Sequence, residues 1–179
     1  VIALWFSFGA MFAYISGSPF VMQGQLGLGV GTYSMLFAVS SAMIVLGSAV
    51  SARMVNTIDP RRLLAFGILL MLTASVLLLV DALLNPTVWV IVPLLMLALF
   101  SMGFIMGNAT ALATGLARRR AGAASAMLGA GQFVVAGAIS PLVGLGADAA
   151  ATMGTVMTCS VLVALAGYVW GVKRENYTS

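Results

Sequence analysis

The sequence predicts an all-α integral membrane protein built as a bundle of six transmembrane helices. Of its 179 residues, 62% are hydrophobic and 7% are charged, whereas about 25% of the residues in a soluble domain are charged. The mean hydropathy is +1.14. So few charged side chains cannot cover a water-facing surface, so we expect most of the surface to face lipid.

Six apolar stretches are long enough to cross a bilayer, which takes about 20 residues in a helix. Short, turn-rich connections separate them. The fourth stretch exceeds the hydrocarbon core, so we expect it to tilt, to protrude or to kink at Pro93. Because Val1 already lies in an apolar run, we expect the N-terminal half of the protein to be missing. The predicted spans are 1–22, 34–52, 63–84, 88–116, 121–146 and 151–172, with a tail at 173–179.

The basic residues predict the orientation of the chain. All eight fall in the second and fourth connections and in the tail, which lie on one side of the membrane. The positive-inside rule makes that side cytoplasmic, with the C-terminus inside a bacterial inner membrane. The arginine run is too short to predict nucleic-acid binding. The eight are Arg53, Arg61, Arg62, Arg118, Arg119, Arg120, Lys173 and Arg174.

Several kinds of chemistry are not predicted. The chain has no histidine and a single cysteine, Cys159, so it offers neither an internal disulfide nor a zinc site. No nucleophile with a base, pair of catalytic acids or phosphate loop is evident, so we expect no enzyme, no cofactor and no metal. The four acids, Asp59, Asp81, Asp148 and Glu175, lie away from mid-membrane. A proton relay would need a carboxylate in the missing half.

Polar side chains gather on one face of each of two spans. Tyr14 and Ser18 share a side of the first span, and Ser101, Phe104 and Asn108 align in the fourth. Hydrogen bonding between helices is the ordinary explanation for such residues. Together they also indicate a shared cavity for large, partly apolar molecules. The predicted cavity residues are Tyr14, Ser18, Ser101, Phe104, Asn108 and Gln132.

Other spans suggest packing surfaces. The second and fifth are rich in small residues, and Ala136, Ser140 and Gly144 recur at every fourth position. This spacing lets helices approach closely, and it is also compatible with a sliding interface between two halves of a transporter. The third span, nearly featureless, is expected to face lipid, and so is the sixth.

Two segments are candidates for gating. The stretch "FAYISGSPFVMQ", residues 12–23, contains Gly17 and Pro19, which weaken a helix near its outer end. It is either a simple helix end or a hinge. Asp59, before Pro60, is either an N-terminal cap of the third span or, with Arg61, a latch between cytoplasmic helix ends.

Three stretches resemble the C-terminal half, spans seven to twelve, of a major facilitator superfamily transporter, in its bicyclomycin-resistance (Bcr/CflA) branch of drug/proton antiporters. They are "FAYISGSPFVMQ", "SARMVNTIDPRRLL", and "GNATALATG" followed by "AGAASAMLGAGQFVVAGAISPLVG". The resemblance implies half of a twelve-helix fold. In that fold, helices one and four of each half line the cavity, helices two and five meet the other half, and helices three and six face lipid. "GAISPLVG" resembles a weak antiporter motif, which makes Gly137 and Pro141 interface candidates.

The resemblance implies a monomeric membrane transporter. We expect it to export drugs or other hydrophobic small molecules by alternating access, with proton antiport through the missing half. The alternatives are a transporter of this fold for a small metabolite and a non-transporting membrane scaffold.

Overall fold

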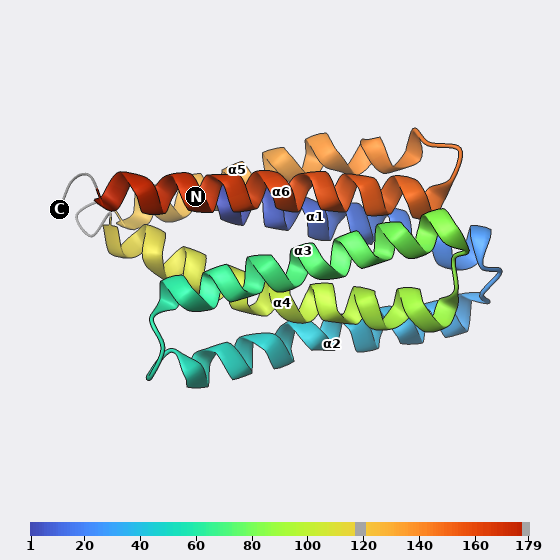
Figure 1. Cartoon of the computed structure of the whole chain (residues 1–179), viewed down its shortest axis with the longest axis horizontal. Helices are drawn as coiled ribbons and strands as arrows, with labels where there is room; N and C mark the ends of the chain where they lie inside the picture. Colours follow the sequence, from blue (N-terminus) through green and yellow to red (C-terminus); the bar gives the residue numbers. More distant parts are fainter. Residues whose placement is uncertain (117–120, 177–179) are drawn as a thin grey trace.

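The computed structural model describes residues 1–116 and 121–176, which form six long helices lying roughly along one axis (Figure 1). All six are long and apolar enough to cross a membrane, which confirms the predicted six-helix transmembrane fold. Two short segments have a different helical geometry: the π-helix η1 (Phe20–Gln25) and the 3-10 helix η3 (Ser140–Gly144). The long helices are α1 (Ile2–Pro19), α2 (Val30–Met54), α3 (Pro60–Leu84), α4 (Val88–Leu116), α5 (Ala121–Ile139) and α6 (Ala149–Asn176).

Some helix ends differ from the predicted limits. The first span runs through η1 to Gln25 rather than ending at residue 22. The second begins at Val30 rather than at 34, because the chain completes its turn earlier. Gly27, with φ of +67°, is the only described residue in the left-handed region, and Gly29 is already the extended residue before α2. A single glycine therefore makes the turn. The glycine-rich sequence had predicted a longer loop, up to residue 34.

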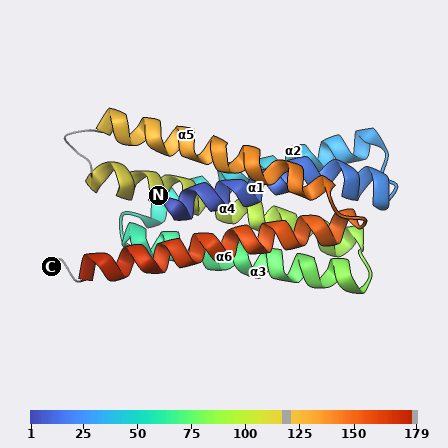
Figure 2. The ribbon, with the colours of Figure 1, turned by 90° about the horizontal axis from the view of Figure 1, so that it is seen from above.

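The chain divides into a first set of three helices, α1 to α3, and a second set, α4 to α6. The first helix of each set packs against the two later helices of the other set. α1 lies against α5 and α6, whereas α4 lies against α2 and α3. α3 and α6 pack on each other and join the two groups. Figure 2, turned from the view of Figure 1, shows α1 lying between α5 and α4. This exchange makes α1 and α4 the central helices of the bundle.

Burial follows from that arrangement. The most apolar window of α1 with η1 is 61% buried and that of α4 is 56% buried, but the values are 17% for α2 and 22% for α5. The exposed side chains of α2 and α5 are nevertheless largely apolar, and include Met35, Val45, Met127 and Val134. The bundle therefore has two outer helices whose apolar faces it does not cover itself.

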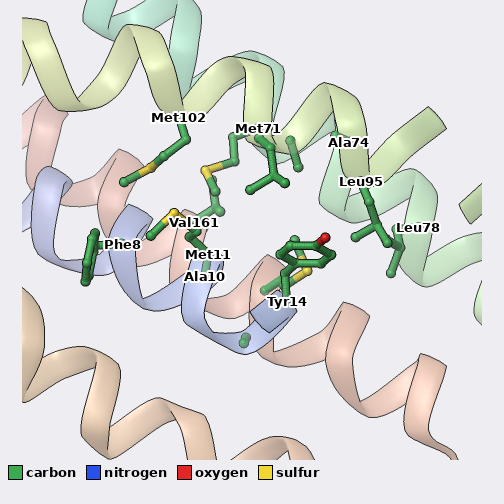
Figure 3. Close-up of a cluster of buried hydrophobic side chains, with 14 of the residues drawn as sticks. Phe8, Ala10, Met11, Tyr14, Met71, Ala74, Leu78, Leu95, Met102 and Val161 are labelled. Atoms are coloured by element: carbon green, nitrogen blue, oxygen red, sulfur yellow. The ribbon is translucent and has the colours of Figure 1, made fainter. Parts of the chain in front are cut away.

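The core lies between α1, α3, α4 and α6. Its buried side chains include Met11, Met71, Met102 and Val161, which converge in Figure 3. Methionine fills irregular gaps well because its side chain is flexible and polarizable. The core fixes how α1 and α4 are rotated about their axes, and so decides which way their polar side chains point.

The described basic residues lie at one end of the bundle. Arg53 ends α2, Arg61 and Arg62 begin α3, and Lys173 is near the end of α6. Figure 1 shows these helix ends together, opposite η1 and the connection between α5 and α6. This grouping matches the predicted charge asymmetry, and the cytoplasmic assignment stays a prediction. Of the predicted basic residues, Arg118, Arg119 and Arg120 lie outside the described residues, as does the end of the tail, 177–179.

Candidate functional site

The predicted polar face of α1 meets α2. The ring of Tyr14 stacks on that of Phe37, with centroids 5.8 Å apart and planes 11° apart. One turn further on, the hydroxyls of Ser18 and Tyr33 form a hydrogen bond of 3.1 Å. Tyr14 and Ser18 are both buried. The structure therefore brings these two predicted residues together, at a contact within the six-helix bundle.

The predicted polar face of α4 also turns inward, toward α2 and α3. The Asn108 amide donates to the Ser51 hydroxyl at 2.8 Å and to the Phe104 carbonyl at 2.7 Å. The ring of Phe104 lies edge-on to Phe66 of α3, with centroids 5.3 Å apart. Ser101 donates to the Ala98 carbonyl of its own helix at 2.6 Å. Ser101, Phe104 and Asn108 thus share one side of α4, as predicted, and that side is buried.

A groove of about 200 Å³ runs along the α2–α4 contact next to Asn108. Its walls include Ser48, Ser51, Gly103 and Gly107. The groove is narrow because two glycines bring the backbones close together. A Cβ on Gly103 would lie 2.6 Å from the Ile44 carbonyl oxygen, and one on Gly47 would meet the Phe100 carbonyl. Close approach through small residues was predicted for the second span, and it occurs here.

An aromatic cluster joins α1 to α5 beside the predicted residue Gln132. The rings of Phe8 and Phe12 lie 5.0 Å apart, and Phe133 meets them edge-on at 5.4 and 6.3 Å. Phe133 is 59% exposed and Gln132 is half-buried. Phe133 is not among the residues that the sequence singled out. The available signal was a lone aromatic residue in a span otherwise made mostly of small side chains.

The α-helix α1 ends at Pro19, but the chain does not turn away there. Pro19 has helical angles, φ −63° and ψ −41°, and the chain continues into η1. There the Leu26 amide donates to the Val21 carbonyl at 2.9 Å, five residues back, as in a π-helix. The α-helical geometry therefore ends at Pro19 while the span continues, and the hinge stays a prediction.

The outer end of α1 is tied to α5 and α6. A Cβ on Gly17 would lie 2.7 Å from Val143 and 2.9 Å from Met153, so this glycine permits close packing. The hydroxyls of Ser16 and Ser140 are hydrogen-bonded. Gln25 in η1 accepts from the Ala150 amide at 3.0 Å, at the start of α6. Any bending at Pro19 would therefore involve the neighbouring helix ends.

Asp59 is the N-terminal cap of α3. Its carboxylate accepts from the Arg61 amide at 2.7 Å, and Pro60 is the first residue of the helix. This confirms the cap among the two predicted roles. The Tyr168 hydroxyl of α6 donates to the Arg61 carbonyl at 3.1 Å and ties the helix ends together. The latch involving Asp59 and Arg61 stays a prediction.

The two interface candidates lie on the outside of the bundle. A Cβ on Gly137 would have no neighbour within 4 Å. Pro141 is exposed at the start of η3. A larger residue at 137 would therefore not clash with the described bundle. It would contact only a molecule or domain that covers this face of α5.

Comparison with known proteins places this geometry in a family. The sequence profile of the Major Facilitator Superfamily matches residues 1–141. The Bacillus subtilis (strain 168) protein named Uncharacterized MFS-type transporter YdgK is 28% identical over 171 residues, covering 96% of this chain and 42% of that protein. A Haemophilus influenzae protein named Bicyclomycin resistance protein homolog is 25% identical over 174 residues, covering 95% of this chain and 43% of that protein.

No solved structure matches the chain. The chain spans less than half the length of these two relatives. The matches confirm the resemblance that the sequence predicted. The profile covers most of the chain, including both central helices and the segment around Pro19. This chain belongs to the major facilitator superfamily.

Proposed function

We propose that the chain is the C-terminal six-helix half of a transporter that exports drugs or other hydrophobic small molecules by alternating access. The observation that carries the proposal is the uneven burial of the helices. Only 17% of the residues in the most apolar window of α2, and 22% in that of α5, are buried, although the exposed side chains of both helices are largely apolar. A second six-helix half would cover these faces, and each relative is long enough to contain one. Two halves that rock against each other are the basis of alternating access.

The aromatic cluster supports a hydrophobic substrate. We propose that the substrate surface centres on Phe12, Gln132 and Phe133, because Phe12 and Phe133 meet between α1 and α5 and all three side chains are at least partly exposed. Aromatic walls with a few polar groups are typical of sites for drug-sized molecules. Tyr14 and Ser18 would reach such a molecule when the contact between α1 and α2 opens.

The remaining cavity candidates, Ser101, Phe104 and Asn108, would hold α4 in place from its buried side. Their hydrogen bonds and ring contacts join α4 to α2 and α3. In this role they would affect transport through the position of α4.

The name of the Haemophilus influenzae relative supports drugs as the substrate class.

Coupling to protons is part of the proposal. Of the three aspartates, Asp59 caps α3, Asp81 accepts from the Thr87 amide at 3.3 Å, and Asp148 accepts from the Ala151 amide at 2.9 Å. All three serve helix ends or connections, so we place the proton-carrying carboxylate in the half of the transporter outside this chain. We further propose a monomer in the bacterial inner membrane with its C-terminus in the cytoplasm.

An efflux assay on the full-length gene tests the proposal. In an efflux-deficient bacterium, we expect expression to lower the steady-state accumulation of ethidium and chloramphenicol severalfold. A protonophore should abolish the difference. Unchanged accumulation of both compounds, with the protein present in the membrane, would contradict drug export. A pH-dependent uptake of an amino acid or sugar by the same cells would then favour the metabolite alternative, and no transport at all would favour the scaffold.

Substitution of Gly137 by leucine tests whether this face of α5 meets the other half of the transporter. The new side chain has open space within this bundle, so the full-length protein should still fold and insert into the membrane. Efflux should fall by at least tenfold, because the leucine would wedge the two halves apart. Gly137→Ala is the matched control and should retain most activity. Full efflux by Gly137→Leu would show that this face of α5 meets lipid.

A further inference from the structure

The contact between α1 and α2 is made mainly by side chains. The backbones of these two helices scarcely approach each other, whereas α2 lies closely along α4. Tyr14 and Phe37 span the gap as a ring stack, and Ser18 and Tyr33 span it as a hydroxyl pair. We call these four residues, together with Ser40, the α1–α2 seam.

Two hydroxyls in this seam have no hydrogen-bond partner. Tyr14 is 2% exposed and Ser40 is 0% exposed, yet neither hydroxyl oxygen forms a hydrogen bond. The Ser40 hydroxyl is close enough to that of Tyr14 to interact with it, but the two do not meet the geometry of a hydrogen bond. Burying an unpaired hydroxyl is unfavourable, and folded proteins rarely leave such groups unsatisfied. Two of them side by side, on different helices, indicate a place that a polar atom can occupy.

The surroundings restrict the chemistry of that atom. Figure 3 shows the Tyr14 hydroxyl pointing from α1 into the buried cluster, near Leu95 and Leu78, as the one oxygen among the labelled side chains. The Phe37 ring covers one face of Tyr14. Such an apolar setting disfavours an ion, because a charge would lose its hydration without gaining an opposite charge. Each hydroxyl can donate one hydrogen bond, and a carbonyl oxygen accepts two.

We propose that Tyr14 and Ser40 form a subsite that binds one uncharged oxygen atom, a carbonyl or ether oxygen, of an otherwise apolar exported molecule. The proposal rests on the proposed function and adds to it the class of substrate and a residue on α2. The ligand would enter by rotation of the Tyr14 and Phe37 side chains, since the backbones of α1 and α2 scarcely approach each other. A water molecule offers the same oxygen chemistry, so the test must separate a water from a substrate.

The test uses the full-length transporter with two probes. Chloramphenicol carries an amide carbonyl, whereas tetraphenylphosphonium has no atom that forms a hydrogen bond. The variants Tyr14→Phe and Ser40→Ala each remove one hydroxyl and preserve most of the side-chain packing. We expect each to reduce chloramphenicol efflux about three- to tenfold, as expected for one hydrogen bond. Tetraphenylphosphonium efflux should change less than twofold.

Tyr33→Phe is the matched control. It removes a seam hydroxyl that already has a partner, Ser18, and should affect both probes equally. An equal loss of both probes in Tyr14→Phe and Ser40→Ala would overturn the proposal. So would unchanged efflux of both probes combined with a lower unfolding temperature without drug, since that result identifies a bound water. Unchanged efflux and unchanged or increased stability would also overturn it, because the two hydroxyls would then contribute neither to substrate binding nor to stability.

A binding measurement separates this proposal from the proposed function. If the wild-type protein exports neither probe, the proposed function fails, and calorimetric titration of the purified full-length protein decides about the subsite. Chloramphenicol binding weakened three- to tenfold by both Tyr14→Phe and Ser40→Ala, with tetraphenylphosphonium binding unchanged, would support the subsite. Binding of chloramphenicol that is absent, or insensitive to both substitutions, would overturn it.

Discussion

The two neighbours of α2 hold it in opposite ways. Toward α4, Gly47 and Gly103 let the backbones touch, and the Asn108–Ser51 hydrogen bond of 2.8 Å closes the contact. Toward α1, the backbones stay apart, and aromatic rings with one hydroxyl pair fill the gap. The first contact depends on backbone shape, and the second on side-chain conformation.

This difference indicates which parts of the bundle move together. A contact between backbones cannot change without shifting a whole helix, so α2 and α4 should behave as one rigid pair. Side chains change rotamer far more readily, so the α1–α2 seam can open while both helices keep their shape. The same helix therefore has one permanent and one adjustable neighbour, which suits a transporter whose cavity must open and close.

The largest expected effect comes from adding a methyl group to the rigid contact. Gly103→Ala would place a Cβ 2.6 Å from the Ile44 carbonyl oxygen. Because backbone atoms cannot rotate away, we expect the free energy of unfolding to fall by about 3 kcal/mol, at the upper end for overpacking. Thermal unfolding of the purified full-length protein measures this change.

Gly107→Ala on the same helix is the control for Gly103→Ala. A Cβ there would meet nothing within 4 Å, and alanine favours a helix more than glycine does. We expect its stability to stay equal or rise slightly. If both variants unfold alike, the α2–α4 contact is not the rigid one.

The sequence predicted the helices better than their rotations. Apolar stretches of sufficient length correspond to all six spans, and Asp59 before Pro60 marked a helix start through local chemistry. Periodicity also grouped Ser101, Phe104 and Asn108 on one side of α4. It could not tell which neighbour that side faces, because this depends on packing between helices distant in the sequence.

Two features could not be predicted from the local sequence alone. Pro19 weakens an α-helix by general rules, yet the chain continues as a π-helix held by contacts to α6, such as Gln25 with the Ala150 amide. Ser40 was one of several small residues in α2, and its unpaired hydroxyl became visible only when Tyr14 was placed beside it. Both depend on tertiary contacts.

An intermediate effect is expected when the ring stack of the seam is removed. Phe37→Leu keeps an apolar side chain but loses the stacking with Tyr14 at 5.8 Å. We expect a loss of about 0.5–1.5 kcal/mol in the free energy of unfolding. We also expect altered relative efflux of different drugs, because the seam is the adjustable contact. Phe66→Leu, which removes an aromatic contact on the α3 side of α4, is the control and should leave the drug profile unchanged.

The smallest expected effect is that of the hydroxyl pair, and it measures how firmly the seam is closed. The variants Ser18→Ala and Tyr33→Phe, alone and combined, form a double-mutant cycle around the 3.1 Å hydrogen bond. Interhelical hydrogen bonds in membranes contribute about 0.6 kcal/mol on average, because the unfolded chain in the membrane also finds partners. We expect a coupling energy near that value from thermal unfolding of the four proteins. A coupling above about 2 kcal/mol, beyond the range known for such bonds, would mean that the hydroxyl pair locks the seam. The α1–α2 contact would then be as permanent as the α2–α4 contact.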